Sequence, residues 1–258
     1  MHEPRRMALV QHGFAEGGVL LAIVGWWLTA RGVPDFVLPS PVQVAATLTR
    51  FATEPALLAH LAITFLRVTA AVALAMMLAI VLAVAGRRSR LAMAVIEQRL
   101  LLILNSFPSV GWAILGIIWF KVSNTTVIFI ETAIVLPFCL INAIEGFRQI
   151  DAELEEMGRS LSRSRIRLFT RVTLPLVMPF LVAGLRVAFG ICWKIALVAE
   201  LFGSQSGLGY LLLRAQSNSD AAMVFACCFV IVLVVFAVDR LAFVPLSRAY
   251  SANQGGNQ

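Results

Sequence analysis

The sequence is poor in charged residues and in the side chains that many enzyme sites require. Only 14% of its 258 residues are charged and 60% are hydrophobic, whereas ordinary soluble domains have about 25% charged and about 45–50% apolar residues. It has only two lysines, two tyrosines and three histidines. Because this much apolar surface exceeds what a soluble chain of this length buries, the composition predicts a membrane protein.

Motifs for catalysis, metal binding and nucleotide binding are missing from the sequence. The three histidines form no HExxH motif and no serine-centred elbow is present, which argues against a membrane-embedded enzyme. Neither Lys121 nor Lys194 follows a glycine, so the chain has no P-loop for ATP. We expect no catalytic residue, no metal site and no cofactor in this chain. The cysteines lack metal-ligand spacing and are interpreted as small buried side chains: Cys139, Cys192, Cys227 and Cys228.

Apolar segments long enough to cross a bilayer recur along the chain. The first is the weakest, because Val19–Ala30 alone falls short of the roughly 20 residues that a crossing helix needs. The third is interrupted by Asn105 and Pro108, and its start is placed as early as Leu91. More apolar segments follow the first, so we interpret it as a retained helix and not as a cleaved signal peptide. The six segments lie at about 18–30, 61–85, 100–120, 125–144, 172–199 and 221–238.

The distribution of Lys and Arg predicts the orientation of these segments. With a cytoplasmic N-terminus, the inner loops hold fourteen of these residues and the outer loops four, as the positive-inside rule requires. This explains the net charge of +7 better than nucleic-acid binding does. We expect a cytoplasmic N-terminus at 1–17, a six-helix domain at 18–245 and a cytoplasmic tail at 246–258. The domain includes an outer loop at 31–60, with a short surface helix, and a cytoplasmic loop at 145–172.

The cytoplasmic loop has an amphipathic pattern. Leu154, Met157 and Leu161 are spaced i, i+3 and i+7, so they share one face of a helix whose flanks are charged. Such a helix is expected to dock against a partner. The alternative is a solvated loop that only joins two helices.

This loop resembles the EAA loop of ABC importer permeases. The family pattern has an acidic residue, small residues, a glycine and a Leu-Pro pair that opens the next helix. Serine stands at 162, where the family has glycine, and serine is strained at the positive φ that glycine tolerates, so we expect a reshaped turn. The resemblance implies that the ATPase-coupling residues are Glu156, Met157, Gly158, Leu161, Ser162, Phe169, Leu174 and Pro175.

The resemblance extends over most of the chain and is closest to the nitrate/sulfonate/taurine-type branch. It implies an all-α integral membrane protein with six transmembrane helices, of the MetI-like type I ABC permease class with cytoplasmic coupling helices, in a bacterial cytoplasmic (inner) membrane. The similar segments, in the order and spacing of that branch, are VLPSPVQV (37–44), HLAITFLRV (60–68), the segment 105–119, AELFG (199–203) and SGLGY (206–210).

The partners follow from the same resemblance. It implies a homodimer in membrane lipid, two ATP-binding subunits that hold ATP and Mg, and an extracytoplasmic solute-binding protein, with no nucleic acid. The solute would be an oxyanion such as a sulfonate, taurine or nitrate. Relatives that carry a pyrimidine vitamin precursor or an aromatic acid leave those classes open. The alternative from another class is an ion-coupled secondary transporter, but no repeated halves are visible.

Polar residues within the apolar segments are the candidates for a translocation pathway, because charges in a bilayer usually face a bundle interior or a water-filled cavity. Arg186, Trp193 and Glu200 recur every seven residues, which places them on one helix face, with Arg186 about 21 Å along the helix. An ion pair between helices is the alternative for the charged residues, and kinking or packing for the others. The candidates are Arg67, Asn105, Ser106, Trp112, Glu131, Arg186, Lys194 and Glu200.

Overall fold

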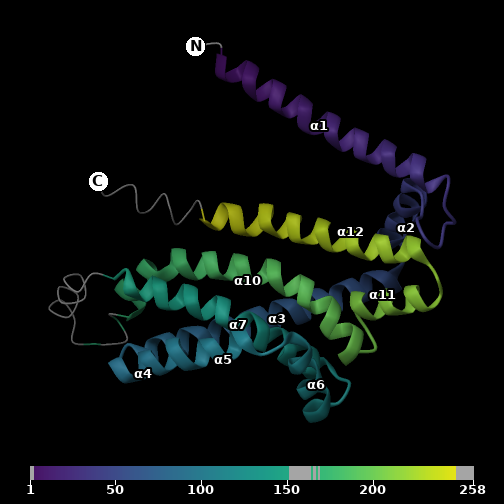
Figure 1. The fold of residues 1–258 in the computed structure, drawn as a ribbon. Coiled ribbons are helices and arrows are strands. Elements are labelled where there is room, and N and C mark those ends of the chain that lie inside the picture. Colours follow the sequence, from purple (N-terminus) through teal and green to yellow (C-terminus); the bar gives the residue numbers. More distant parts are fainter. Residues whose placement is uncertain (1–2, 151–163, 165–166, 168, 248–258) are drawn as a thin grey trace. The chain divides into compact units, whose positions relative to one another are not determined.

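The computed structural model describes residues 3–150, 164, 167 and 169–247, and every regular element in this part is helical (Figure 1). The predicted all-α class is therefore confirmed. The α-helices are α1 (Glu3–Ala30), α2 (Pro41–Thr53), α3 (Pro55–Gly86), α4 (Arg90–Val95), α5 (Leu101–Ser106), α6 (Ser109–Phe120), α7 (Asn124–Arg148), α10 (Leu174–Gly203), α11 (Leu208–Ser217) and α12 (Ala221–Val238). Short π-helical turns cover Ile96–Leu100, Phe169–Thr173 and Asp239–Phe243.

Four helices of the described residues are long and apolar enough to cross a bilayer. They are α3, α7, α10 and α12, the last continuing as helix to Ser247. A fifth candidate is the helix pair Arg90–Ser106 and Ser109–Phe120, which is bent by 85° at the predicted interruption near Pro108 and begins close to Leu91, as expected. The apolar part of α1, Gly17–Ala30, is shorter than these spans. The described residues thus give four or five spans, and the number six stays a prediction.

The bend between α5 and α6 follows from the local sequence. Pro108 has no backbone N–H, and the residue before a proline is disfavoured in the helical region. Phe107 is accordingly extended, with φ −74° and ψ 125°, and its N–H closes α5 by bonding to the carbonyl of Ile103. The helix must stop here and restart in a new direction.

The chain forms two compact units. The larger comprises Ala59–Tyr210 and the described residues from Ile231 onward, and its centre is α7 packed along α10 (Figure 1). A small residue makes this approach possible, because a Cβ added to Gly184 of α10 would lie 2.8 Å from Cβ of Asn142 in α7. Small residues at helix contacts are typical of membrane proteins. Helices α5 and α6 also pack against α7.

The smaller unit contains the described residues up to Leu58 together with Leu211–Val230. Its helix α2 is the short helix expected in the outer loop, and Ser40 and Gln43 form a capping box at its start, satisfying N–H groups that a helix end leaves free. Val44 and Phe51 are buried on its inner face.

The cysteines are only partly as predicted. Cys139, Cys192 and Cys227 are buried, but Cys228 is exposed. Consecutive helix residues point about 100° apart, so Cys227 and Cys228 face different sides of α12. The prediction that all four cysteines are buried is therefore wrong for Cys228.

Candidate functional site

Arg67 of α3 is the centre of a buried polar network in the larger unit. Its side chain is 4% exposed. Its Nη1 donates to Oε1 of Glu200 at 2.7 Å and to the carbonyl of Ser206 at 2.8 Å. Its Nε donates to Oδ1 of Asn124 at 3.1 Å, and Nη2 donates to Oγ of Ser206 at 2.7 Å. One guanidinium therefore joins α3, α7, α10 and the connection 204–207.

Glu200, near the end of α10, is fully buried and has partners for both carboxylate oxygens. Besides Arg67, Oγ1 of Thr64 lies 2.9 Å from each oxygen, and the N–H of Gly209 donates to Oε2 at 2.9 Å. The hydroxyl of Thr64 also accepts the N–H of Leu208 at 2.8 Å. A buried charge is tolerated when it is paired and hydrogen-bonded in this way.

Two glycines let the connection between α10 and α11 close over this carboxylate. Gly207 has φ +103°, and a Cβ there would overlap the carboxylate of Glu200. Its N–H donates to Nδ1 of His60 at 2.9 Å, and the His60 ring stacks on Tyr210 with centroids 5.9 Å apart. A Cβ on Gly209 would lie 2.7 Å from Cβ of Glu200. The sequence SGLGY thus meets a steric requirement at both glycines.

The network joins three segments that the sequence analysis identified separately as similar to the family. Residues from 60–68, 199–203 and 206–210 meet around Glu200, although Thr64 and Glu200 are 136 positions apart. Sequence reasoning singled out Arg67 and Glu200 but missed Thr64 and its neighbours in the network, Asn124, Ser206 and His60. The joint occurrence of these three segments was the available signal.

Glu131 of α7 is the second buried carboxyl of the larger unit. It is 0% exposed, and Oε2 accepts a hydrogen bond from Sγ of Cys192 at 3.8 Å. Its Oε1 has no hydrogen-bond partner among the described residues. Within the single chain, Glu131 therefore lies in packed interior and faces no surface.

The uncharged pathway candidates lie at the bend between α5 and α6. Asn105 and Ser106 are exposed in the last turn of α5, and Nδ2 of Asn105 donates to the carbonyl of Leu101 at 3.0 Å. The ring of Trp112 packs against Phe107 with centroids 4.6 Å apart. This geometry agrees with the kinking and packing alternative for these residues.

The two cations in the middle of α10 are exposed. Arg186 forms a two-bond ion pair with Asp239, with Nη2 to Oδ2 at 2.8 Å, and its side chain is 47% exposed. Lys194 is also exposed, whereas Trp193 and Glu200 are fully buried. Arg186, Trp193 and Glu200 keep one side of α10 by their spacing, but only Trp193 and Glu200 are covered by neighbouring helices, so the predicted common face is buried over only part of its length.

Most of the predicted ATPase-coupling residues lie outside the described residues: Glu156, Met157, Gly158, Leu161 and Ser162. Phe169 begins a π-helical turn, and Leu174 and Pro175 form the first turn of α10. Proline suits this position because the first N–H groups of a helix have no partner within it.

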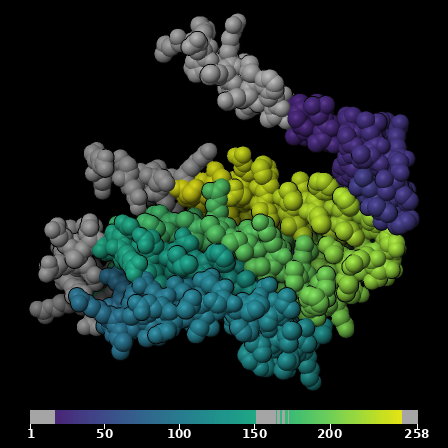
Figure 2. Space-filling view, in the orientation of Figure 1, coloured from purple at the N-terminus to yellow at the C-terminus, as the bar shows by residue number. Residues whose placement is uncertain are grey.

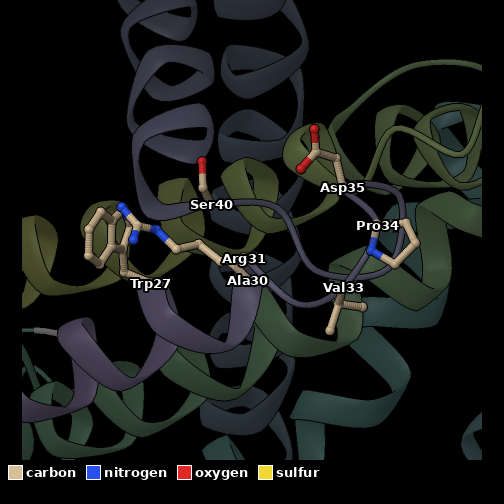
Figure 3. A pocket seen from close by; sticks show the side chains of 7 residues that line it. All are labelled: Trp27, Ala30, Arg31, Val33, Pro34, Asp35 and Ser40. Atoms are coloured by element: carbon tan, nitrogen blue, oxygen red, sulfur yellow. The ribbon is translucent and has the colours of Figure 1, made fainter.

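A cavity of about 430 Å³ lies in the smaller unit, beside the end of α1 (Figure 3). The guanidinium of Arg31 lies 3.6 Å from the ring centroid of Trp27, and Oδ2 of Asp35 accepts from Nε2 of Gln43 at 2.8 Å. Both charges already have partners within the chain. The cavity is lined by Trp27, Ala30, Arg31, Val33, Pro34, Asp35 and Ser40.

Apolar spanning helices that bury the Arg67–Glu200 ion pair and expose the Arg186–Asp239 pair are typical of a multi-pass membrane protein whose charges face a bundle interior or a water-filled cavity. The chain belongs to the family described as binding-protein-dependent transport system inner membrane component, whose profile matches residues 71–244. It is the permease subunit of an ABC importer for a small solute. The family resemblance predicted from the sequence is confirmed.

Three relatives illustrate this similarity. SsuC of Bacillus subtilis (strain 168), named as an aliphatic sulfonates transport permease protein, is 29% identical over 233 residues, covering 88% of this chain and 82% of SsuC. The SsuC protein of Escherichia coli (strain K12) is 33% identical over 135 residues, covering 52% and 49%. The formylaminopyrimidine transport permease protein ThiX of Halalkalibacterium halodurans is 28% identical over 217 residues, covering 83% and 86%.

Proposed function

We propose that this permease imports a small oxyanion of the sulfonate class, driven by ATP that partner subunits hydrolyse. The observation that carries the substrate class is the similarity to a permease protein named for aliphatic sulfonates over 88% of the chain. The exposed Lys194 on a spanning helix agrees with an anionic solute, whereas the nearby Arg186 is paired with Asp239. Charges at such a depth normally face protein or water.

The proposed assembly is a homodimer with two ATP-binding subunits, which hold ATP and Mg²⁺, and an extracytoplasmic solute-binding protein. Each copy crosses a bacterial inner membrane six times. The four long helices, the bent pair and the apolar part of α1 supply six segments for these crossings. In this proposal residues 1–17 and 246–258 face the cytoplasm and 18–245 form the membrane domain, which the excess of Lys and Arg in the inner loops supports.

The loop at 145–172 is the proposed coupling element. In this proposal a groove of the ATPase subunit receives Glu156, Leu161, Ser162 and Phe169. Apolar side chains fill the groove and charges set the register. Movement of this loop reaches the bundle through Leu174 and Pro175, because they begin α10 and α10 packs along α7. The remaining pathway candidates are Arg67, Asn105, Ser106, Trp112, Glu131 and Glu200.

The test uses the permease reconstituted in proteoliposomes with its ATPase and binding protein. The variant Glu156→Ala/Leu161→Ala is expected to lose both ATPase co-purification and ATP-driven uptake of ethanesulfonate. The matched control is Glu54→Ala/Leu58→Ala, which removes the same residue types from an accessible site on the other side of the predicted membrane. The control is expected to keep both properties. Uptake by the permease without any ATPase would instead identify an ion-coupled secondary transporter.

A pyrimidine vitamin precursor is the second candidate solute. The similarity to ThiX over 83% of the chain favours it. Competition decides between the two classes: excess formylaminopyrimidine would inhibit ethanesulfonate uptake only if the system recognises the pyrimidine.

A further inference from the structure

One face of α10 is exposed along the middle of the helix. Ala183, Val187, Lys194 and Val198 are exposed at helical spacing, and a Cβ added to Gly190, which belongs to the same row, would meet no atom within 4 Å. Figure 2 shows α10 in green reaching the surface. Residues at i, i+3, i+4, i+7 and i+8 lie on one side of a helix, so these positions form a continuous strip.

The charges of this strip are far from both ends of the helix. At a rise of about 1.5 Å per residue, Arg186 lies about 18 Å and Lys194 about 30 Å from Leu174, in a helix about 45 Å long. Charged groups at such depth are unfavourable in hydrocarbon and almost always face protein or water. The strip is therefore expected to contact water or a polar partner in the assembled transporter.

The charges on the strip favour binding of an anion. Arg186 is neutralised by its two-bond pair with Asp239. Lys194 makes no hydrogen bond or ion pair with any described residue. The strip in each copy therefore presents the positive charge of Lys194 without a partner among the described residues, beside the open space at Gly190.

We propose that the α10 strip from Ala183 to Val198 is a wall of the translocation pathway, and that Lys194 holds a singly charged oxyanion beside Gly190. This inference rests on the proposed function, which supplies the importer and its oxyanion. A sulfonate group suits the site because it carries one charge and three acceptor oxygens for the ammonium donors of lysine. The Arg186–Asp239 pair orients the wall without competing for the anion.

The first experiment measures ATP-driven uptake of ethanesulfonate by the complete complex in proteoliposomes. Lys194→Met is expected to lower the uptake rate about tenfold, the effect of losing one charge-assisted hydrogen bond, and Lys194→Arg to restore most of it. Lys121→Met is the matched control, since it changes the other lysine, which lies outside the spanning helices. Equal uptake by Lys194→Met and Lys121→Met would overturn the role of Lys194.

The second experiment tests the wall itself at Gly190. Gly190→Leu has room within the chain, so it is expected to assemble normally with the ATPase but to block uptake; normal uptake would overturn the wall. Gly190→Cys, with Cys228 changed to serine, is expected to react with a charged methanethiosulfonate reagent and to be protected by ethanesulfonate. A thiol that does not react contradicts the wall, and one that reacts without protection contradicts the anion site. A complex that imports no sulfonate refutes the proposed substrate and the anion site, whereas thiol reactivity still decides the wall.

Discussion

Replacing Arg67 with leucine is expected to destabilise the permease by about 3–5 kcal/mol, the usual cost of removing one partner of a buried ion pair. Glu200 is 0% exposed and would remain as a buried carboxylate without its cation. The change also removes the guanidinium donors to Asn124 and Ser206. The loss should therefore lie at the upper end of that range.

A double variant separates the charge from the hydrogen bonds. Glu200→Gln keeps an acceptor for the N–H of Gly209 and for Thr64 but removes the negative charge. Arg67→Leu/Glu200→Gln leaves neither charge unpaired, so it is expected to be more stable than Arg67→Leu alone. Neighbouring residues in one network are coupled by about 0.5–3 kcal/mol in such cycles.

The assay is reversible unfolding of the purified permease in mixed micelles, followed by circular dichroism at neutral pH. The matched control is Arg50→Leu, which removes an exposed Arg–Glu pair with 2.7 Å between Nε and Oε1 of Glu54. The hydrogen bond from Arg50 lowers the pKa of Glu54, so this pair contributes above that pKa and is lost as the pH falls through it. Exposed pairs contribute little, and no measurable change is expected. Equal unfolding free energies for Arg67→Leu and Arg50→Leu would refute the role of burial.

Two further predictions concern steric fit and burial. Gly207→Ala is expected to destabilise the permease by more than about 1 kcal/mol, because φ is +103° and a Cβ would collide with the carboxylate of Glu200. Gly190→Ala is the control and should have little effect. Similar thermal midpoints for the two variants would contradict this prediction. In detergent, Cys228 is expected to react with a maleimide, whereas the buried Cys192 is not. Peptide mass spectrometry after labelling measures both reactions. Faster labelling of Cys192 than of Cys228 would contradict the described packing.

The spans could be predicted from the sequence because hydrophobic length and proline act locally. The break at Pro108 follows from a missing N–H group, and α3 begins at Pro55, just after the predicted outer helix. These features need no knowledge of which helices touch. The same local rules make the first segment the shortest, since the apolar part of α1 is only Gly17–Ala30.

The partners of the buried charges could not be predicted, because they depend on packing. The sequence does not indicate that Arg67 and Glu200 form an ion pair, since 133 positions separate them. Likewise, seven-residue periodicity placed Arg186 with Trp193, but contact with α7 decides which side of α10 is buried. The ATPase-coupling role of Glu156 stays a prediction that biochemistry must test.

The 85° turn at Phe107–Pro108 also restricts what can surround the chain at that point. The last carbonyls of α5 have no following turn of helix to donate N–H groups to them, and acyl chains offer none. Lipid tails alone would leave these oxygens unsolvated. The turn between α5 and α6 must therefore contact another protein surface or water instead of lipid.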